Sequence, residues 1–298
     1  MINFRPGAPH LFAFDINSHF SRVFKVQAPN DQSPTHPGAR YMGEPVFCLK
    51  PLLSLVEKEI RLVTELGYPN THIALVFDHA SKNFRHEMYP AYKANRKPKT
   101  EDFLRQEALM FDMFRSLGYP CLKIQGVEAD DVLATLASGL SKRGVYTTLF
   151  SGDKDTMSCT GDFVQAFAGR EKKLYQSRQV EEKFGIPPSR LLDFLAMKGD
   201  SADNVPGVSG VGDTIATAIL QRYSLDEILE NPDVLTQLPV RGSSKLPHLI
   251  RSQTSQLQLS RRLVGLKTNV ELSFNFRDMQ RTAPMYADFL SGYMRPGH

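Results

Sequence analysis

Short apolar runs that end in acidic residues recur along the chain. Residues 11–15 read Leu-Phe-Ala-Phe-Asp, residues 72–78 read His-Ile-Ala-Leu-Val-Phe-Asp, and residues 145–153 end in Ser-Gly-Asp. A shorter run, 120–124, leads into the acidic stretch Glu128–Asp131. Apolar runs of this length, bounded by turn-forming residues, are typical of buried strands. The pattern predicts four strands, each followed by carboxylates.

Segments with helical periodicity lie between and after these runs. Apolar residues recur at three- and four-residue spacing over 50–66, 132–140, 189–198 and 214–223. Strands that alternate with helices predict parallel β-α units. We therefore expect an α/β fold with a parallel-sheet core flanked by helices. Two further short runs within 163–175 predict a hairpin.

The second part of the chain differs from the first because its pattern is helical throughout. We expect an α/β core over residues 1–180 and a helical region over 181–298, with residues 260–268 packing back on the core. Residues 27–45 are rich in Pro, Gly, Asn and Ser and predict a loop.

Acidic residues follow the predicted strands at equivalent positions. In parallel α/β folds, functional side chains collect just beyond the carboxyl ends of the strands. A single aspartate there is more often a turn or cap former, and acids at a helix start complement the helix dipole. Recurrence at several strand ends favours a shared site. The predicted set is Asp15, Asp78, Glu128, Asp130, Asp131, Asp153, Asp155, Asp200 and Asp203.

The negative charge of so many neighbouring carboxylates must be neutralised. Two ionised carboxylates about 5 Å apart repel each other by roughly 3 kcal/mol at an effective dielectric near 20. Carboxylate oxygens suit Mg²⁺ or Mn²⁺, and no histidine or cysteine has a spacing that indicates zinc. Two such ions with basic residues beside them are typical of phosphodiester hydrolysis.

Two further segments have features that suit nucleic acid. Residues 82–105 interleave lysines and arginines with phenylalanines and tyrosines, which suits phosphates and bases; a solvated surface helix is the alternative. Gly207, Gly210 and Gly212 precede a helix start whose free N–H groups suit phosphate; a plain connector is the alternative.

Composition narrows the class of protein. The 298 residues carry a net charge of +4, which is weak support for a polyanionic partner. We see no signal peptide and no apolar run long enough to span a bilayer. The three cysteines have no metal-ligand spacing and are expected to be free thiols. We expect a cytoplasmic protein, from a bacterium or a phage-infected cell, with no membrane partner.

Together these motifs make the chain resemble the 5′-nuclease superfamily, which includes the 5′→3′ exonuclease domain of bacterial DNA polymerase I and stand-alone flap endonucleases. The resemblance covers about residues 11–270, and the motifs occur in the order of the family. They are Phe14-Asp15 with Arg22, Val76–Asp78 with Phe84-Arg85, Tyr92–Arg96, Gly126–Asp131, Ser151–Asp155 and Gly199–Gly212. The chain ends where a polymerase would continue, so we expect a stand-alone nuclease.

The resemblance implies a PIN-like core, a helical arch at about 82–105 and a helix–three-turn–helix at about 189–223. It implies two Mg²⁺ or Mn²⁺ ions, one held by the acids from Asp15 to Asp131 and the other by those from Asp153 to Asp203. Lys93 and Arg85 match residues that assist at the scissile phosphate. The implied DNA contacts are Arg22, Tyr92, Arg96, Lys99, Gly207, Gly210, Val211, Gly212, Thr214 and Ile215. Carbonyls of Met197, Lys198, Pro206, Val208 and Val211 match those that bind K⁺.

The implied function is a structure-selective 5′ nuclease that acts as a monomer on 5′ flaps, nicks and duplex 5′ ends of DNA. RNA primers and a DNA polymerase are further expected partners. Where relatives usually have Pro-Lys-Thr, this chain has Asp213-Thr214-Ile215, which predicts weaker or more salt-sensitive duplex binding. A DNA-binding accessory protein without catalysis and a PIN-type ribonuclease are the alternatives. A phosphatase would leave most of the acids without a role.

Overall fold

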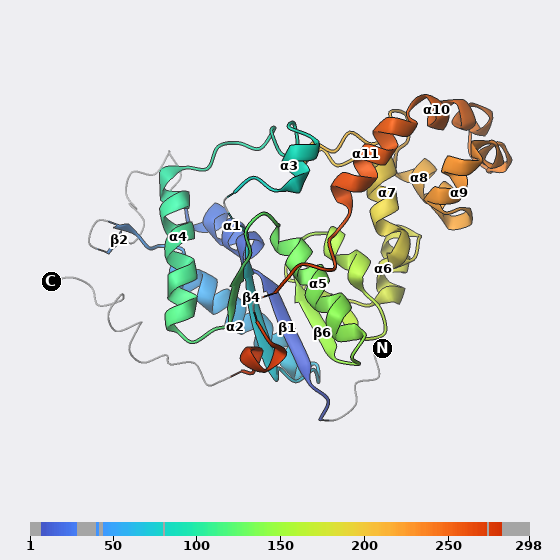
Figure 1. Cartoon of the computed structure of the whole chain (residues 1–298). Coiled ribbons are helices and arrows are strands. Elements are labelled where there is room, and N and C mark those ends of the chain that lie inside the picture. The colour runs from blue at the N-terminus through green and yellow to red at the C-terminus, as the bar shows by residue number, and fades with distance from the viewer. Residues whose placement is uncertain (1–6, 29–39, 42–43, 80, 273, 282–298) are drawn as a thin grey trace.

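The first part of the chain forms a mainly parallel sheet with helices on both faces (Figure 1). The computed structural model describes residues 7–28, 40–41, 44–79, 81–272 and 274–281. The sheet has six strands in the order β5-β4-β1-β6-β7-β8, and every neighbouring pair is parallel except β7–β8. The strands are β1 (His10–Asp15), β4 (His72–Phe77), β5 (Cys121–Lys123), β6 (Tyr146–Phe150), β7 (Val164–Ala168) and β8 (Lys173–Tyr175).

The two faces of β1 show why its run is apolar throughout. Phe12 and Phe14 lie on one face, where Phe14 stacks on Phe150 with ring centroids 4.0 Å apart. Leu11 and Ala13 lie on the other face. All four side chains are fully buried, because helices cover both faces of a parallel sheet. On the Phe12 face the helices are α1 (Ile16–Gln27), α2 (Leu49–Glu65) and α4 (Glu101–Ser116), and on the other face α5 (Ala129–Ser141).

The second part of the chain is a helical region with its own apolar cluster, which includes Ile219, Leu220 and Leu257. Short 3₁₀ turns connect several of its helices. The helices are α6 (Ser177–Phe184), α7 (Leu191–Lys198), α8 (Asp213–Arg222), α9 (Leu225–Glu230), α10 (Leu246–Ser252) and α11 (Thr254–Val264). No helix in the described part of the chain is long and apolar enough to cross a membrane.

Three local expectations need correction. The predicted loop 27–45 contains the short antiparallel strands β2 (Arg40–Tyr41) and β3 (Glu44–Pro45). Of the segment 82–100, only α3 (Phe84–Met88) is helical. Tyr89 has extended backbone because a following proline, Pro90, disfavours helix at the residue before it. The described residues after α11 form no α-helix, only a short 3₁₀ turn at Phe276–Met279, and this stretch runs over α5, where Lys267 donates its backbone N–H to Asp131.

Candidate metal centre

Two carboxylates are fixed by helix starts at the carboxyl edge of the sheet. Asp15, the last residue of β1, caps α1 by accepting the Ser18 N–H at 2.9 Å. Asp78, directly after β4, accepts the Ala129 N–H at 2.8 Å, at the first residue of α5. The N–H of Asp78 in turn donates to the side chain of Asn17 at 2.9 Å. Asp15 and Asp78 therefore both cap a helix and lie in the acidic site.

The turn after β6 adds two more carboxylates. Asp153 donates its N–H to the Ser151 hydroxyl at 3.1 Å, and Asp155 donates its N–H to Asp153 Oδ1 at 3.2 Å. The Ser151 hydroxyl also lies 3.4 Å from Asp15 Oδ2. Asp130, the second residue of α5, is half-buried, and repulsion from Asp15, Asp153 and Asp155 contributes to raising its pKa. The strand ends thus bring Asp15, Asp78, Asp130, Asp153 and Asp155 together.

These five carboxyls have little positive charge around them, although their exposure differs. Asp15 is buried, Asp130, Asp153 and Asp155 are half-buried, and Asp78 is exposed. Burial and repulsion from Asp78 raise the pKa of Asp15 to about 7. Burial, with repulsion from neighbouring aspartates, also raises the pKa values of Asp130 and Asp155 well above the ordinary value. One oxygen of each, Oδ1, is buried without a hydrogen-bond partner among the described residues. Carboxylates whose buried oxygens lack partners fit a divalent cation, which would supply both the charge and the missing contacts.

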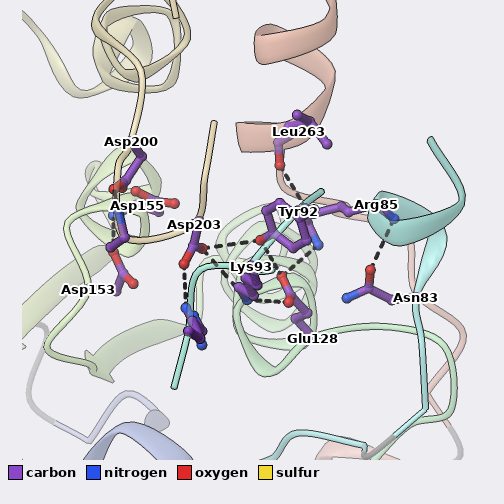
Figure 2. A network of polar contacts seen from close by, with 12 residues as sticks. Asn83, Arg85, Tyr92, Lys93, Glu128, Asp153, Asp155, Asp200, Asp203 and Leu263 are labelled. Atoms are coloured by element: carbon purple, nitrogen blue, oxygen red, sulfur yellow. Dashed lines mark hydrogen bonds and ion pairs between the residues drawn. The ribbon is translucent and has the colours of Figure 1, made fainter. Parts of the chain in front are cut away.

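Glu128 and Asp203 differ from these five carboxyls because basic side chains of the protein already neutralise their charge. Lys93 forms an ion pair with Glu128, and its Nζ also lies 3.6 Å from Asp203 Oδ2 (Figure 2). Arg96 forms an ion pair with Asp203. The Tyr92 hydroxyl donates to both acids, at 3.0 and 3.2 Å. Burial alone would raise the pKa of Glu128, but attraction to Lys93 and Arg85 lowers it.

Asp200 is also held by a cation, since Lys154 Nζ lies 2.8 Å from its Oδ2. The lysine prevails over burial and lowers the pKa of Asp200. As the side chains stand, no three acids, histidines or cysteines in the described ranges surround a point closely enough to hold one ion. The acids therefore form an uncompensated group at the strand ends and a cation-paired group, Glu128, Asp200 and Asp203, around it.

Asp131 and Arg85, predicted as a metal ligand and a phosphate contact, are paired with each other in this structure. They form a bidentate pair with N–O distances of 2.7 and 2.8 Å, and both side chains are buried. Arg85 also donates to Glu128 and to the backbone carbonyls of Leu263 and Gly265. All five N–H donors of the guanidinium are thereby used. This arrangement ties α3 to α5 and to the end of α11.

Three of the predicted DNA contacts lack an exposed side chain or a free backbone. The Tyr92 ring is only 4% exposed, so it offers no face for base stacking. The Val211 side chain is buried in the apolar cluster of the helical region. Gly207 donates its N–H to Ser260 and accepts a bond from Gln256. In contrast, Gly210, Gly212 and Thr214 are exposed and Ile215 is half-buried.

Arg22 belongs to a buried cluster that its sequence context did not reveal. Its guanidinium pairs with Glu59 at 2.6 Å, and the other oxygen of Glu59 lies 2.8 Å from His19 Nε2. His19 Nδ1 lies 2.6 Å from the Asp15 carbonyl oxygen, so both ring nitrogens face acceptors. A hollow of about 110 Å³ adjoins this cluster beside the Asp153 turn. It is lined by Ser18, His19, Arg22, Gly152, Gly169 and Arg170.

The glycine-rich loop packs tightly against the end of α7. A side chain at Gly207 would place Cβ 2.4 Å from the Gly199 nitrogen, so the two backbones approach as only glycine allows. The Met197 carbonyl accepts the Val208 N–H at 2.7 Å, and the Val208 carbonyl accepts the Val211 N–H at 3.0 Å. At the start of α8, Asp213 pairs with Lys198 at 2.6 Å.

Several residues that hold the acidic side chains in place were not predicted from the sequence. Asn17 and Ser151 hold Asp78 and Asp153, and Lys154 neutralises Asp200. Ser151 and Lys154 flank the predicted acids in sequence, so adjacency was a usable signal. Asn17 and Glu59 gave no such signal, because their contacts lie 61 and 37 to 40 residues away in sequence.

Two family descriptions match the chain in succession. One, "5′-3′ exonuclease, N-terminal resolvase-like domain", matches residues 10–185, and the other, "5′-3′ exonuclease, C-terminal SAM fold", matches residues 186–287. DNA polymerase I of Rhizobium leguminosarum is 32% identical over 96% of this chain, which spans only 27% of that relative. The 5′-3′ exonuclease of Aquifex aeolicus is 31% identical over 92% of this chain and 87% of its own length.

Solved structures share the fold. The T5 D15 protein, co-crystallised with metal ions, has a TM-score of 0.67 and 22% identity, covering 87% of this chain and 90% of that chain. Human GEN1 in complex with Holliday junction DNA has a TM-score of 0.54 and 16% identity, covering 92% of this chain and 64% of that chain. At these identities the likeness concerns the fold alone.

Proposed function

Because the chain belongs to the 5′-3′ exonuclease family, we propose that it is a 5′ nuclease that hydrolyses phosphodiester bonds of DNA at 5′ flaps, nicks and duplex 5′ ends. The observation that carries the proposal is the group of five uncompensated carboxyls with raised pKa values at the strand ends: Asp15, Asp78, Asp130, Asp153 and Asp155. The named relatives support it, and T5 D15 protein has been crystallised with metal ions.

We propose that these carboxylates hold two Mg²⁺ or Mn²⁺ ions, with Glu128, Asp200 and Asp203 completing the shells. Bound ions of this kind lower the pKa of water and stabilise negative charge on phosphate oxygens. Lys93 lies beside Glu128 and Asp203 and would orient the scissile phosphate through its ammonium group. Arg85 and Asp131 would act as a support that fixes α3 beside α5.

The basic side chains around the acids would bind the DNA backbone. Arg22 and Arg170 line the hollow next to Asp153, and Lys99 lies on the segment that leads into α4. Exposed Gly210, Gly212 and Thr214 would bring the start of α8 to the phosphates of the duplex. We further propose that a K⁺ ion binds the carbonyls at the end of α7 and in the glycine-rich loop, where each carbonyl that accepts one hydrogen bond retains a second lone pair.

The double substitution Asp153→Asn with Asp155→Asn tests the proposal. Cleavage of a labelled 5′ flap with Mg²⁺ should fall by at least about 10²-fold, because two carboxylates of the site lose their charge. Binding of the same flap in Ca²⁺ should persist. Asp162→Asn is the control, since Asp162 is exposed and lies outside the site. Full cleavage by the double variant would contradict the proposal, and binding without cleavage by the wild type would indicate an accessory protein.

A further inference from the structure

Two segments more than 100 residues apart in sequence interlock beside Lys93. We call residues 89–96 the arch-base turn and residues 199–205 the Asp200 loop. Asn204 Nδ2 donates to the Ala91 carbonyl at 2.7 Å, the Lys93 N–H donates to the Asp203 carbonyl at 2.9 Å, and Asn95 Nδ2 donates to the Ser201 carbonyl at 2.5 Å. Each bond ends on a backbone carbonyl, so the bonds fix the relative position of the two backbones.

Two of the three non-glycine residues with a left-handed backbone, among those described, lie at this contact. Lys93 and Asn204 both have φ of +57°, and Lys172 is the remaining non-glycine residue with positive φ among those described. Asparagine tolerates this conformation, but lysine rarely adopts it. A residue stays in a sparsely populated conformation only when its surroundings hold it there. The bond from the Lys93 N–H and the bond to Ala91, two residues earlier, are the restraints that flank Lys93.

The backbone of Lys93 sets the direction of its side chain. The ammonium group pairs with Glu128 and lies 3.6 Å from Asp203 Oδ2, above the Tyr92 ring at 4.9 Å. The Asn204 side chain instead donates to the Ala91 carbonyl. Paired backbone hydrogen bonds between Asp200 and Val205 close the Asp200 loop, so the backbone of Asn204 is held in place.

We propose that Asn204 is a positioning residue, which holds the arch-base turn on the Asp200 loop and thereby places Lys93 at the acidic site. This inference rests on the proposed nuclease function and on the role of Lys93 in it. It also gives a physical link between the two parts of the site. The Asp200 loop continues directly into the glycine-rich loop 206–212, which is the part of the chain predicted to contact duplex DNA.

Asn204→Gly and Asn204→Asp test the proposal in complementary ways. Glycine keeps the left-handed backbone and removes the amide, whereas aspartate keeps the shape and replaces the donor by an acceptor that faces the Ala91 carbonyl. Both variants should lower kcat on a 5′ flap with Mg²⁺ by roughly 10- to 100-fold, because small misplacements of a reacting group are costly. KM and the melting temperature should change little. Asn269→Gly, at an exposed asparagine after α11 that lies outside both segments, is the control and should leave kcat unchanged.

A double-variant comparison separates positioning from a general structural role. In a Lys93→Ala background, Asn204→Gly should lower kcat by less than about twofold, because residues that act through one another are not additive. A full repeat of the Asn204 effect in that background would overturn the proposal, as would an unchanged kcat in both Asn204 variants. A wild-type chain that cleaves no DNA would overturn the nuclease proposal itself, a result distinct from an active wild type with unaffected Asn204 variants.

Discussion

At the scale of single residues, the site is defined by which charges are compensated. Arg85 is 2% exposed, yet every N–H of its guanidinium has an acceptor, and its pKa is raised because Asp131 and Glu128 outweigh the cost of burial. Asp130 has the opposite environment, with burial and neighbouring aspartates that both raise its pKa. Two acids one position apart on α5 thus differ in chemistry, because one faces a cation and the other faces carboxylates.

Asp131→Asn is expected to lower the free energy of unfolding by about 3 to 5 kcal/mol, because it leaves the buried Arg85 charge without its bidentate partner. Denaturant unfolding in the absence of divalent ions measures this effect. A matched Asp130→Asn variant should be at least as stable as the wild type above neutral pH, since it removes an uncompensated charge. If Asp131→Asn weakened Mg²⁺ binding without loss of stability, Asp131 would be a metal ligand after all.

At the scale of elements, helix starts decide where anions can sit. The start of α5 is occupied by the Asp78 carboxylate, which accepts the Ala129 N–H, and the start of α1 by Asp15. The start of α8 carries its own anion, Asp213, which is 66% exposed and paired with Lys198. A phosphate that approaches α8 therefore meets a carboxylate, and the nearby lysine is partly neutralised before DNA arrives.

Asp213→Asn is expected to tighten binding of duplex DNA several-fold at low salt, since it removes one repulsive charge and releases Lys198. The logarithmic dependence of affinity on salt should become steeper by about one unit, the slope expected for one additional phosphate contact. Fluorescence anisotropy in Ca²⁺ over a salt series measures both quantities. Glu230→Gln is the control, because it makes the same change in charge at the exposed end of α9. Equal effects of the two variants would exclude a specific role for Asp213.

At the scale of the whole molecule, the fold gathers negative charge that is costly in the absence of metal. The folded chain raises the pKa of Asp15 from 3.8 to about 7, and the pKa values of Asp78, Asp130, Asp153 and Asp155 are raised as well. Between pH 4 and pH 7 the unfolded chain loses protons that the folded chain retains. Ionisation in this range therefore favours the unfolded state.

Without divalent ions, the raised pKa values of the five aspartates should lower the melting temperature as the pH rises from about 4.5 to about 7, the window set by the Asp15 pKa. Burial lowers the pKa of His10 to about 3, which has the opposite effect up to about pH 6.5, and the five aspartates are expected to outweigh this one imidazole. Glu59, Glu128 and Asp200 have lowered pKa values, so their contribution is lost only as the pH falls below this window. Mg²⁺ at about 100 times its Kd should add about 2.7 kcal/mol at pH 8 and much less near pH 5. A thermal scan with EDTA or Mg²⁺ measures this. A flat pH profile in EDTA, or an equal Mg²⁺ effect at both pH values, would contradict the expectation.

The sequence determined that the acids lie on one edge of a sheet. An apolar run followed at once by an aspartate places that aspartate at the end of a strand, as at Asp15 and Asp78. Parallel strands then bring their carboxyl ends to the same edge. The sequence also predicted the hairpin at β7 and β8, the start of the glycine-rich loop and the family motifs. Each of these depends on neighbours within a few residues along the chain.

Only the tertiary structure decided which charges face each other. The pairing of Asp131 with Arg85 joins positions 46 residues apart, and the bond from Asn204 to Ala91 joins positions 113 residues apart. The burial of the Tyr92 ring depends on the Asp200 loop and on Glu128 in the same way. The direction of a side chain follows from packing between distant segments. Local sequence therefore shows that an acid or a cation is present, but it does not show whether that charge is paired, exposed or available to a metal.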